Sequence, residues 1–359
     1  MKNTVKKAGF VITLLLLIGQ FTSCKKSVTT VELADTTTVE NEFTETPEVI
    51  REPVVFITGI DSGKNTFYKS ARQHFIEKEY EVVDDAFSLE EIINWLNKNY
   101  DDRLYGDIHI VSHSNPWKGM SLETVIKGER TTVSSLTKHA LEGNLPTLKN
   151  VIATDSKFIF HACGLGENTA LLKMFKSILS TNISPSIVAS PYYAVFGDSF
   201  SKHYLAKPYY GFYPTANSPG NIDLSKELTR KYPNEKDIDW YDALNNENER
   251  YVGEAYTYKF NIPVQWEFDY SETDEEAPKF KMPEEIMDWI AENETLSKEL
   301  SSYKIPLEKF RWKSYVKGNK LIIKGKTTVI CVLKPLIKPY GELEHINPEI
   351  DNLRLYNVE

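Results

Sequence analysis

Short apolar runs alternate with segments of helical periodicity between residues 53 and 205, and this alternation constrains the fold more than any other feature. A short apolar run bounded by Pro or Gly predicts a buried strand, whereas apolar residues three to four apart predict an amphipathic helix. The alternation is typical of a largely parallel sheet with helices on both faces, so the predicted class is α/β. The expected strands are 54–57, 80–83, 108–112, 157–160 and 187–190. The expected helices are 66–78, a segment after the capping box of Ser88 and Glu91, 168–179 and 200–205.

The alternation stops near residue 215. The segment 217–248 is polar and rich in turn-forming residues, and a long extended strand that contains Pro263 follows it. We therefore expect an α/β domain over 53–214 and a smaller α+β accessory domain over 215–359. The expected elements of the accessory domain are a strand at 256–268, a helix at 284–301 and a meander at 310–333 with turns at 317–319 and 325–326.

The first 23 residues have the composition of a secretory signal. Three lysines precede the apolar run 11–18, which is too short for a membrane span of about 20 residues. The segment 21–24 resembles a bacterial lipobox, in which a cysteine, here Cys24, receives a diacylglycerol and becomes the first residue of the mature chain. We expect a signal peptide over 1–23 and a flexible tether over 24–52, which is rich in Thr, Glu, Ser and Val. The expected location is the cell envelope, with the lipid in the outer or inner membrane and the chain facing the periplasm; exposure at the cell surface is the alternative.

Net charge argues against certain partners, and cysteine content argues against a disulfide framework. The net charge of −9 argues against nucleic acid or anionic lipid as the main partner, so membrane contact is expected through the N-terminal lipid. With Cys24 modified, Cys163 and Cys331 are the remaining cysteines of the sequence, which is too few for a disulfide framework. The hydrophobic fraction of 41% suits a globular protein with a packed core.

Two chemically active residues each follow a predicted strand. His113 comes after the run 108–112, and Cys163 comes after 158–162 and before Gly164-Leu165-Gly166. The carboxyl ends of parallel strands meet at one edge of a sheet, so both side chains are expected there. Small residues after a nucleophile let backbone N–H groups, such as that of Gly164, face a developing oxyanion. We expect the adjacent helix start and imidazole to lower the pKa of the Cys163 thiol.

At these residues the sequence resembles the caspase-like cysteine peptidases, a superfamily that includes caspases, clostripain, gingipains and CHAT-type domains. The His-to-Cys separation is about 50 residues, which is the spacing found in caspases. The resemblance covers about 54–214. It rests on His113, the loop with Gly119, the apolar run 120–122, the segment 161–166, Asp198, Phe200 and the aromatic run 209–213.

The resemblance implies a caspase-like sheet and hydrolysis of peptide bonds through a thioester acyl-enzyme. Cys163 would be the nucleophile, and His113 the acid that protonates the leaving amine. The family usually has glycine after its histidine, and the N–H of that residue helps to form the oxyanion hole; here Ser114 stands in its place, with less conformational freedom. The residue two before the cysteine is commonly Gln and here is His161. The expected partner is a peptide or protein substrate, and no cofactor is predicted.

Other interpretations of the same residues stay open. Cys163 would also suit a buried core position or a disulfide with Cys331. In either case the chain would be a non-enzymatic envelope protein of the same fold, acting in binding or assembly. Ser114 is an alternative nucleophile for a serine hydrolase, although its neighbours Ser112 and Pro116 replace the glycines of a nucleophile elbow.

Weaker signals complete the candidate sites. Asp61 follows the first strand at the same sheet edge, where it would either line a pocket for a basic side chain or cap the turn. The segment 59–65 departs from a phosphate loop in its glycine spacing and in Asn65, which replaces Ser or Thr. The histidines lack the spacing of metal ligands, so no metal site is predicted.

Overall fold

The computed structural model describes residues 49–59, 65–197, 203–215, 218–271, 276–336 and 350–359. The chain divides into two units after residue 46, and every described residue lies in the second unit. The predicted signal peptide, the lipidation site Cys24 and the predicted tether up to residue 48 lie outside the described residues, as do Asp61, Asp198 and Phe200.

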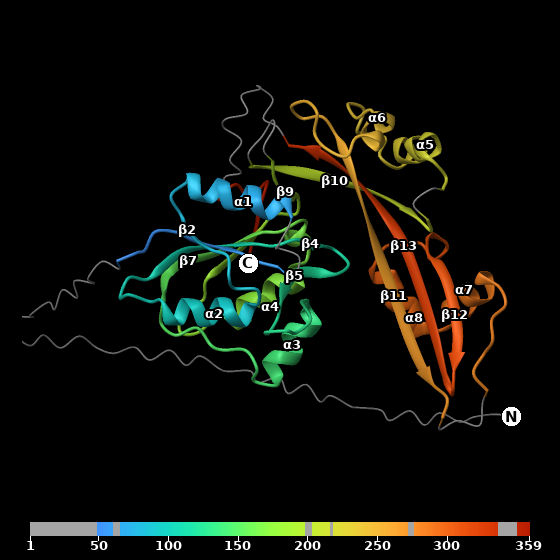
Figure 1. The fold of residues 1–359 in the computed structure, drawn as a ribbon, viewed down its shortest axis with the longest axis horizontal. Coiled ribbons are helices and arrows are strands. Elements are labelled where there is room, and N and C mark those ends of the chain that lie inside the picture. The colour runs from blue at the N-terminus through green and yellow to red at the C-terminus, as the bar shows by residue number, and fades with distance from the viewer. Residues whose placement is uncertain (1–48, 60–64, 198–202, 216–217, 272–275, 337–349) are drawn as a thin grey trace, which may run out of the picture. The chain divides into compact units, whose positions relative to one another are not determined.

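A six-stranded sheet in the order β14-β8-β7-β3-β1-β2 forms the centre of the N-terminal part (Figure 1). Its first five strands in sequence pair in parallel, and β14 joins β8 in antiparallel fashion. This partly parallel sheet confirms the predicted α/β class. The strands are β1 (Val54–Ile57), β2 (Glu81–Val83), β3 (Tyr105–Val111), β7 (Ile152–His161), β8 (Ser186–Ala189) and β14 (Asn357–Val358).

Helices cover both faces of this sheet. The face that carries Phe56, Ile108 and Phe158 packs in one core with α2 (Leu89–Lys98), α3 (Val133–Leu141) and α4 (Thr169–Leu179). The opposite face, with Val55 and Val111, packs against α1 (Thr66–Glu77). Alternation of side chains along each strand places neighbouring residues on opposite faces, so both layers are apolar.

Local sequence sets where these helices begin. The Ser88 side chain accepts the Glu91 N–H at 3.1 Å, and the Glu91 carboxylate accepts the Phe87 N–H at 2.9 Å. The capping pair therefore satisfies two backbone donors at the start of α2, which confirms the helix start predicted at Ser88.

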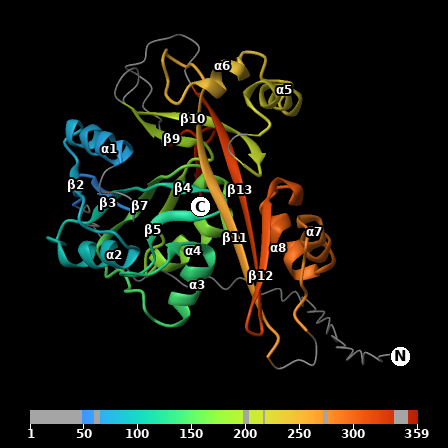
Figure 2. The ribbon, with the colours of Figure 1, turned by 45° about the vertical axis from the view of Figure 1, so that its right-hand side comes forward.

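A second sheet contains β9 (Tyr193–Phe196), β10 (His203–Tyr213), β11 (Tyr256–Asp269), β12 (Arg311–Lys317) and β13 (Lys320–Pro335), all antiparallel. Figure 2 shows β11 and β13 as a long paired ribbon. Pro263 lies in β11, an edge strand that tolerates the missing N–H, so the predicted strand over 256–268 is confirmed. Helices α5 (Asn221–Lys231), α6 (Trp240–Asn245), α7 (Pro283–Glu292) and α8 (Glu294–Ser302) belong to this part.

Strand pairing joins the chain segment before residue 214 to the segment after it. Strands β9 and β10 come from the predicted α/β domain but belong to the second sheet, where β10 pairs with β13. Ala194 and Leu205 of these strands pack on Ile159 and Val188 of the first sheet. The second sheet therefore also covers part of the first.

Three local predictions were wrong. Residues 203–205 belong to β10 rather than to a helix, because they pair with β9. The predicted helix 284–301 is two helices, because the Asn293 side chain accepts the Leu296 N–H at 3.1 Å and starts α8. The predicted turn at 325–326 lies inside β13, where a Cβ on Gly325 would come within 2.8 Å of the Trp312 ring. Glycine at position 325 therefore accommodates the Trp312 indole within the strand and does not form a turn.

Four histidines meet between the first sheet, α1 and β10. His109 Nδ1 and His161 Nε2 share a hydrogen bond of 2.9 Å, and the His203 ring lies 5.5 Å from that of His161 and 5.0 Å from that of His74. Burial lowers the pKa of His109 to about 3 and holds the pKa values of His161 and His203 well below the usual 6.5. The imidazoles of His109, His161 and His203 are therefore neutral members of the core.

We predict that the free energy of unfolding falls as the pH drops below about 6.5. The unfolded chain then takes up protons that the folded chain excludes, at about 1.4 kcal/mol per pH unit for each of His109, His161 and His203. His203→Phe keeps a ring against Phe196, with which His203 stacks at 4.3 Å, and removes one titrating group. Urea unfolding at pH 7, 6 and 5 measures the slope, which should be shallower in the variant; equal slopes would contradict this account.

Candidate active site

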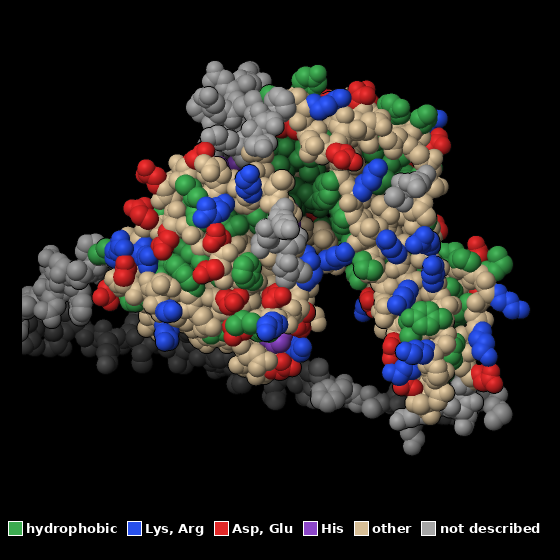
Figure 3. All heavy atoms as spheres, viewed as in Figure 1, with side chains coloured by type: hydrophobic (Ala, Val, Ile, Leu, Met, Phe, Trp, Pro, Cys, Tyr) green, Lys and Arg blue, Asp and Glu red, His purple; other side chains and the backbone are tan. Residues whose placement is uncertain are grey.

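A cavity of about 800 Å³ opens where β3 and β7 end. Its other walls come from the start of α1, from the hairpin of β4 (Ser114–Asn115) and β5 (Gly119–Glu123), and from β9 and β11 of the second sheet. Figure 3 shows hydrophobic side chains inside the hollow. Both His113 and Cys163 line this cavity, as do Asn65, Phe67, Ser114, Ser121, Tyr193, Tyr204 and Tyr258.

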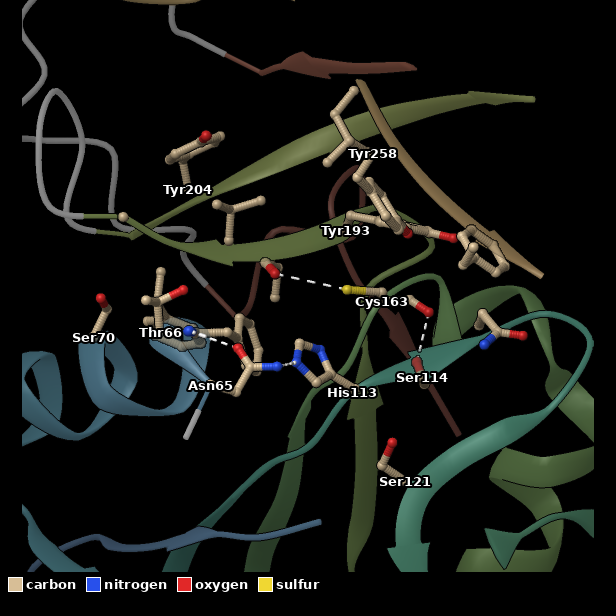
Figure 4. A pocket seen from close by; sticks show the side chains of 18 of the residues that line it. Asn65, Thr66, Ser70, His113, Ser114, Ser121, Cys163, Tyr193, Tyr204 and Tyr258 are labelled. Carbon is tan, nitrogen blue, oxygen red and sulfur yellow. Dashed lines mark hydrogen bonds between the residues drawn. The ribbon is translucent and has the colours of Figure 1, made fainter. Parts of the chain in front are cut away.

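His113 is held by the start of α1. Its ring stacks on Phe67 with centroids 4.4 Å apart, and its backbone N–H donates to the Tyr68 hydroxyl at 3.0 Å. The Asn65 amide nitrogen lies 2.7 Å from His113 Nε2. In Figure 4 the ring lies between Asn65 and Cys163, with its other nitrogen, Nδ1, on the side of Cys163.

Asn65 also sets the tautomer of this imidazole. Asn65 is the N-cap of α1, and its Oδ1 accepts the Phe67 N–H at 3.0 Å. The amide nitrogen therefore faces the ring and donates to Nε2. A neutral imidazole that accepts at Nε2 carries its proton on Nδ1. In this state Nδ1 carries the proton and has no lone pair with which to accept another.

Cys163 is half-buried beside β9. Its thiol donates to the Ala194 carbonyl at 3.8 Å, and burial raises its pKa to about 12 even though backbone hydrogen bonds from Ala194 and Ser114 favour the thiolate. The expectation of a lowered pKa was therefore wrong for this state. The physical reason is burial, and the helix start expected to offset it lies further along the chain: α4 begins at Thr169, capped by Asn168, after a 3₁₀ turn (Leu165–Glu167).

Ser114 connects the ends of the two strands. It belongs to β4 (Ser114–Asn115), which pairs with β5 (Gly119–Glu123) and, through it, with β6 (Arg130–Thr131). Its hydroxyl donates to the Cys163 carbonyl at 2.6 Å (Figure 4), and its backbone interacts with the Cys163 sulfur. The hydroxyl is thus engaged in positioning the turn that carries Cys163.

The glycines after Cys163 have separate structural roles. Gly164 has φ +67, a conformation that favours glycine, and its N–H donates to the Tyr192 carbonyl at 3.0 Å. This N–H therefore does not face an oxyanion, which differs from the expectation for Gly164. A Cβ on Gly166 would lie 2.6 Å from the Ala189 carbonyl, so this turn packs directly on the end of β8.

Cys331 lies in β13 and is fully buried in the aromatic cluster that Cys163 also touches. Both cysteines are free thiols. Burial keeps the pKa of the Cys331 thiol well above the usual 9.0, although the nearby Tyr258 and Tyr193 hydroxyls act to lower it. The two thiols therefore share a cluster without a disulfide between them.

Several lining residues were not singled out from the sequence. Asn65 was considered only as a departure from a phosphate loop, and its capping of α1 beside a histidine has no sequence signature. Lys118 and Arg130 line the same cavity. Among the described residues, no group of three or more His, Cys, Asp or Glu is arranged to hold a metal ion, and no helix has the length and apolar character needed to cross a membrane.

Comparison of the chain with protein-family models, with curated proteins and with solved structures gave no match. What is established is therefore a mixed α/β protein with a partly parallel sheet, whose His113 and Cys163 line one cavity.

We predict slow alkylation of Cys163 by iodoacetamide in the protein without substrate. The thiolate is the reacting form, and a pKa of about 12 leaves only about one thiol in ten thousand ionised at pH 8. The rate should still increase between pH 9 and pH 10, as intact mass spectrometry would show. Cys163→Ala should remove the adduct, because Cys331 is fully buried. A rate that levels off below pH 8 would contradict the raised pKa.

Proposed function

We propose that this protein is a cysteine endopeptidase of caspase-like type, anchored to the cell envelope by lipid on Cys24. Cys163 acts as the nucleophile, and His113 moves the proton. The observation that carries the proposal is the meeting of the two side chains in one cavity at the carboxyl ends of β3 and β7, with Asn65 hydrogen-bonded to the far nitrogen of the imidazole.

The proposed reaction has two halves. In the first, the Cys163 proton passes to His113, the sulfur bonds to the carbonyl carbon, and the Ser114 N–H stabilises the oxyanion. The C–N bond then breaks, the imidazolium gives its proton to the departing amine, and a thioester remains. In the second, His113 takes a proton from water, the hydroxide attacks the thioester carbon, and the thiol leaves with that proton.

The first proton transfer requires a lone pair on Nδ1, which the tautomer set by Asn65 does not offer. Rotation of the Asn65 amide would present Oδ1 to an Nε2–H and leave Nδ1 free to accept the thiol proton. The rotation gives up the N-cap of α1, at about 1 kcal/mol. The substrate-free state is accordingly a resting state, with a protonated thiol and an imidazole whose proton is on Nδ1.

The second candidate function is that of a non-enzymatic envelope protein of the same fold, acting in binding or assembly. Two observations favour it: burial raises the pKa of Cys163 to about 12, and the Gly164 N–H is occupied by the Tyr192 carbonyl. Under this proposal the cavity binds a peptide without cleaving it. The labelling experiment below separates the two functions.

We predict that a peptide acyloxymethyl ketone forms one adduct with residues 25–359, at Cys163. Cys163→Ala should abolish the adduct, and His113→Ala should slow its formation by roughly 10²- to 10⁴-fold, because the imidazole no longer removes the thiol proton. Intact mass spectrometry over a peptide panel measures both effects, and Cys331→Ser is the matched control with an unchanged adduct. Equal rates in the wild type and His113→Ala would favour the binding function.

Asn65 offers a sharper test of the dyad. We predict that Asn65→Asp accelerates labelling at pH 7 by roughly tenfold, because a carboxylate accepts both the Phe67 N–H and an Nε2–H and so stabilises the imidazolium. Asn65→Ala should slow labelling and also destabilise α1. Thermal unfolding separates the two contributions, since Asn65→Asp keeps the helix cap. A rate unaffected by Asn65→Asp would show that Asn65 does not control the imidazole.

The lipid anchor has its own test. Expression of the full chain with an alkyne analogue of palmitate should label the wild type and leave Cys24→Ala unlabelled, because the cysteine at the lipobox is the acceptor. Fractionation should move the variant from the membrane to the soluble periplasmic fraction. Equal labelling of both proteins would rule out lipidation at Cys24.

A further inference from the structure

The ribbon of β11, β12 and β13 has two faces of different character. On one face, Trp312 and Leu321 pack in one core with α7 and α8. The strand pairing places alternate residues on the other face, where Gln265, Lys324 and Lys313 lie side by side across the three strands. We call this second face the basic face. Its charged side chains are all exposed, and they are Arg311, Lys313, Lys317, Lys320, Lys324, Lys326, Glu267 and Asp269.

Like charges lie directly opposite one another on the basic face. The register of β12 on β13 places basic residues opposite each other three times: Arg311 with Lys326, Lys313 with Lys324 and Lys317 with Lys320. Opposed side chains of neighbouring strands have Cβ atoms about 5 Å apart, and like charges at such positions destabilise a sheet. This arrangement therefore calls for negative charge beside the strands.

The chain supplies little of that negative charge. Lys320 Nζ lies 2.6 Å from a Glu267 carboxylate oxygen and 4.0 Å from one of Asp269, at the turn end of the ribbon. Within the described part of the chain, the other five cations of the basic face form no ion pair with a carboxylate. In Figure 3, Lys and Arg side chains gather over this part of the molecule.

The helices on the opposite face of the ribbon carry the opposite charge. Residues 283–302, which form α7 and α8, contain one lysine and six acidic residues, all exposed: Lys298, Glu284, Glu285, Asp288, Glu292, Glu294 and Glu299. The ribbon and its helices therefore form two layers, one basic and one acidic. An anionic surface would attract the basic layer and repel the acidic one, so it would bind this part of the protein in one orientation.

An aromatic side chain lies among the cations. Tyr315 is 45% exposed on the basic face, and Lys324 Nζ lies 5.5 Å from the centre of its ring. Tyrosine and lysine are both suited to a membrane–water interface, where the ring lies at the level of the headgroups and the amine reaches the phosphates. Three paired strands also form a broad surface, which suits an extended partner better than a small ligand.

The proposed lipid anchor brings a membrane within reach of this face. Between Cys24 and residue 49 there are 25 Cα–Cα steps, which span at most about 85 Å. The longest strand of the ribbon, β13, has 16 residues and a length of about 53 Å. A tether of this length leaves the orientation of the protein on the membrane undetermined. The two charged layers would determine it.

We propose that the basic face binds the anionic headgroups of a phospholipid bilayer, with Tyr315 at the interface and with α7 and α8 facing away from the membrane. Lipid phosphates take the place of the missing carboxylates beside the opposed cations. The net charge of −9 argues against anionic lipid for the chain as a whole, whereas this binding depends on the local charge of one face. The inference is independent of the peptidase function, and the nearness of a membrane rests on the proposed anchor.

The test is sedimentation of residues 25–359 with vesicles. This chain keeps every described residue and lacks Cys24, so its binding does not depend on the lipid anchor. It should partition onto phosphatidylcholine vesicles that contain about 30% phosphatidylglycerol and not onto pure phosphatidylcholine, and the binding should weaken as salt rises from about 0.1 to about 0.5 M. Equal partition onto both kinds of vesicle would overturn the proposal.

Substitution of one opposed pair tests the face itself. Lys313→Gln combined with Lys324→Gln should weaken partition roughly 25-fold, which is about fivefold for each charge. Lys98→Gln combined with Lys127→Gln is the matched control, because both lysines are exposed in the N-terminal part and the net charge changes equally. The control should bind as the wild type does. Equal partition of the two double variants would contradict a role for the basic face.

Two further measurements guard against a folding defect. The Lys313→Gln, Lys324→Gln variant should unfold at the temperature of the wild type or above it, because it relieves a like-charge pair. In the unsubstituted chain, phosphatidylglycerol vesicles should slow acetylation of Lys313 and Lys324 by acetic anhydride and leave that of Lys298 on α8 unchanged, as peptide mass mapping would show. Equal protection of all three lysines would overturn the orientation.

A soluble polyanion is the other partner that a basic face suits. Heparin that binds through Lys313 and Lys324 more tightly than the vesicles do would overturn the assignment to a membrane. Absence of vesicle binding together with palmitate labelling of Cys24 would overturn this inference and retain the anchor. Vesicle binding without labelling of Cys24 would retain the basic face and overturn the anchor.

Discussion

The hydrogen bond from the Ser114 hydroxyl to the Cys163 carbonyl is the contact on which the candidate site depends. Strands β3 and β7 are paired in register up to Val111 and His161, and beyond that point their chains separate. The Ser114 side chain bridges the two separated chains. It holds the turn that carries Cys163 in place relative to the end of β3, which is followed by His113. Ser114 has less conformational freedom than a glycine would have, and its hydroxyl has a positioning role that glycine could not supply.

Around that contact, each wall of the cavity is set by a different part of the chain. The N-terminus of α1 supplies Asn65 and Phe67 on one side of the imidazole, the turn between β4 and β5 supplies Lys118, and β6 supplies Arg130. The second sheet supplies Ala194 and the tyrosines beside the sulfur. The state that results has a half-buried Cys163 thiol and an imidazole held by Asn65 and Phe67. A peptide bound in the cavity would change the environment of both.

The sequence predicted the parts of the fold that depend on local pattern. The apolar runs of β1, β3, β7 and β8 and the capping pair at Ser88 were sufficient to place the first sheet and α2. Placement of His113 and Cys163 at strand ends followed from the same pattern. Two features could not be predicted from the sequence pattern. Gly325 is explained by Trp312 on the neighbouring strand, and Asn293 divides a continuous helical pattern through its capping bond with the Leu296 N–H. The pKa of Cys163 likewise depends on β9 and the second sheet, which bury it.

The pairing of β10 has a consequence for the mechanics of the molecule. The strand is hydrogen-bonded to β13 of the second sheet, while Leu205 packs on the first sheet and His203 stacks within the layer beneath α1. Separating the two sheets would therefore expose apolar surface and buried imidazoles on both. The described part of the chain should lose its structure in one cooperative step, and a proteolytic fragment ending near residue 214 would keep the pairing of β10 with β9 but lose its pairing with β13. The same strand thus ties together the two sheets that wall the cavity.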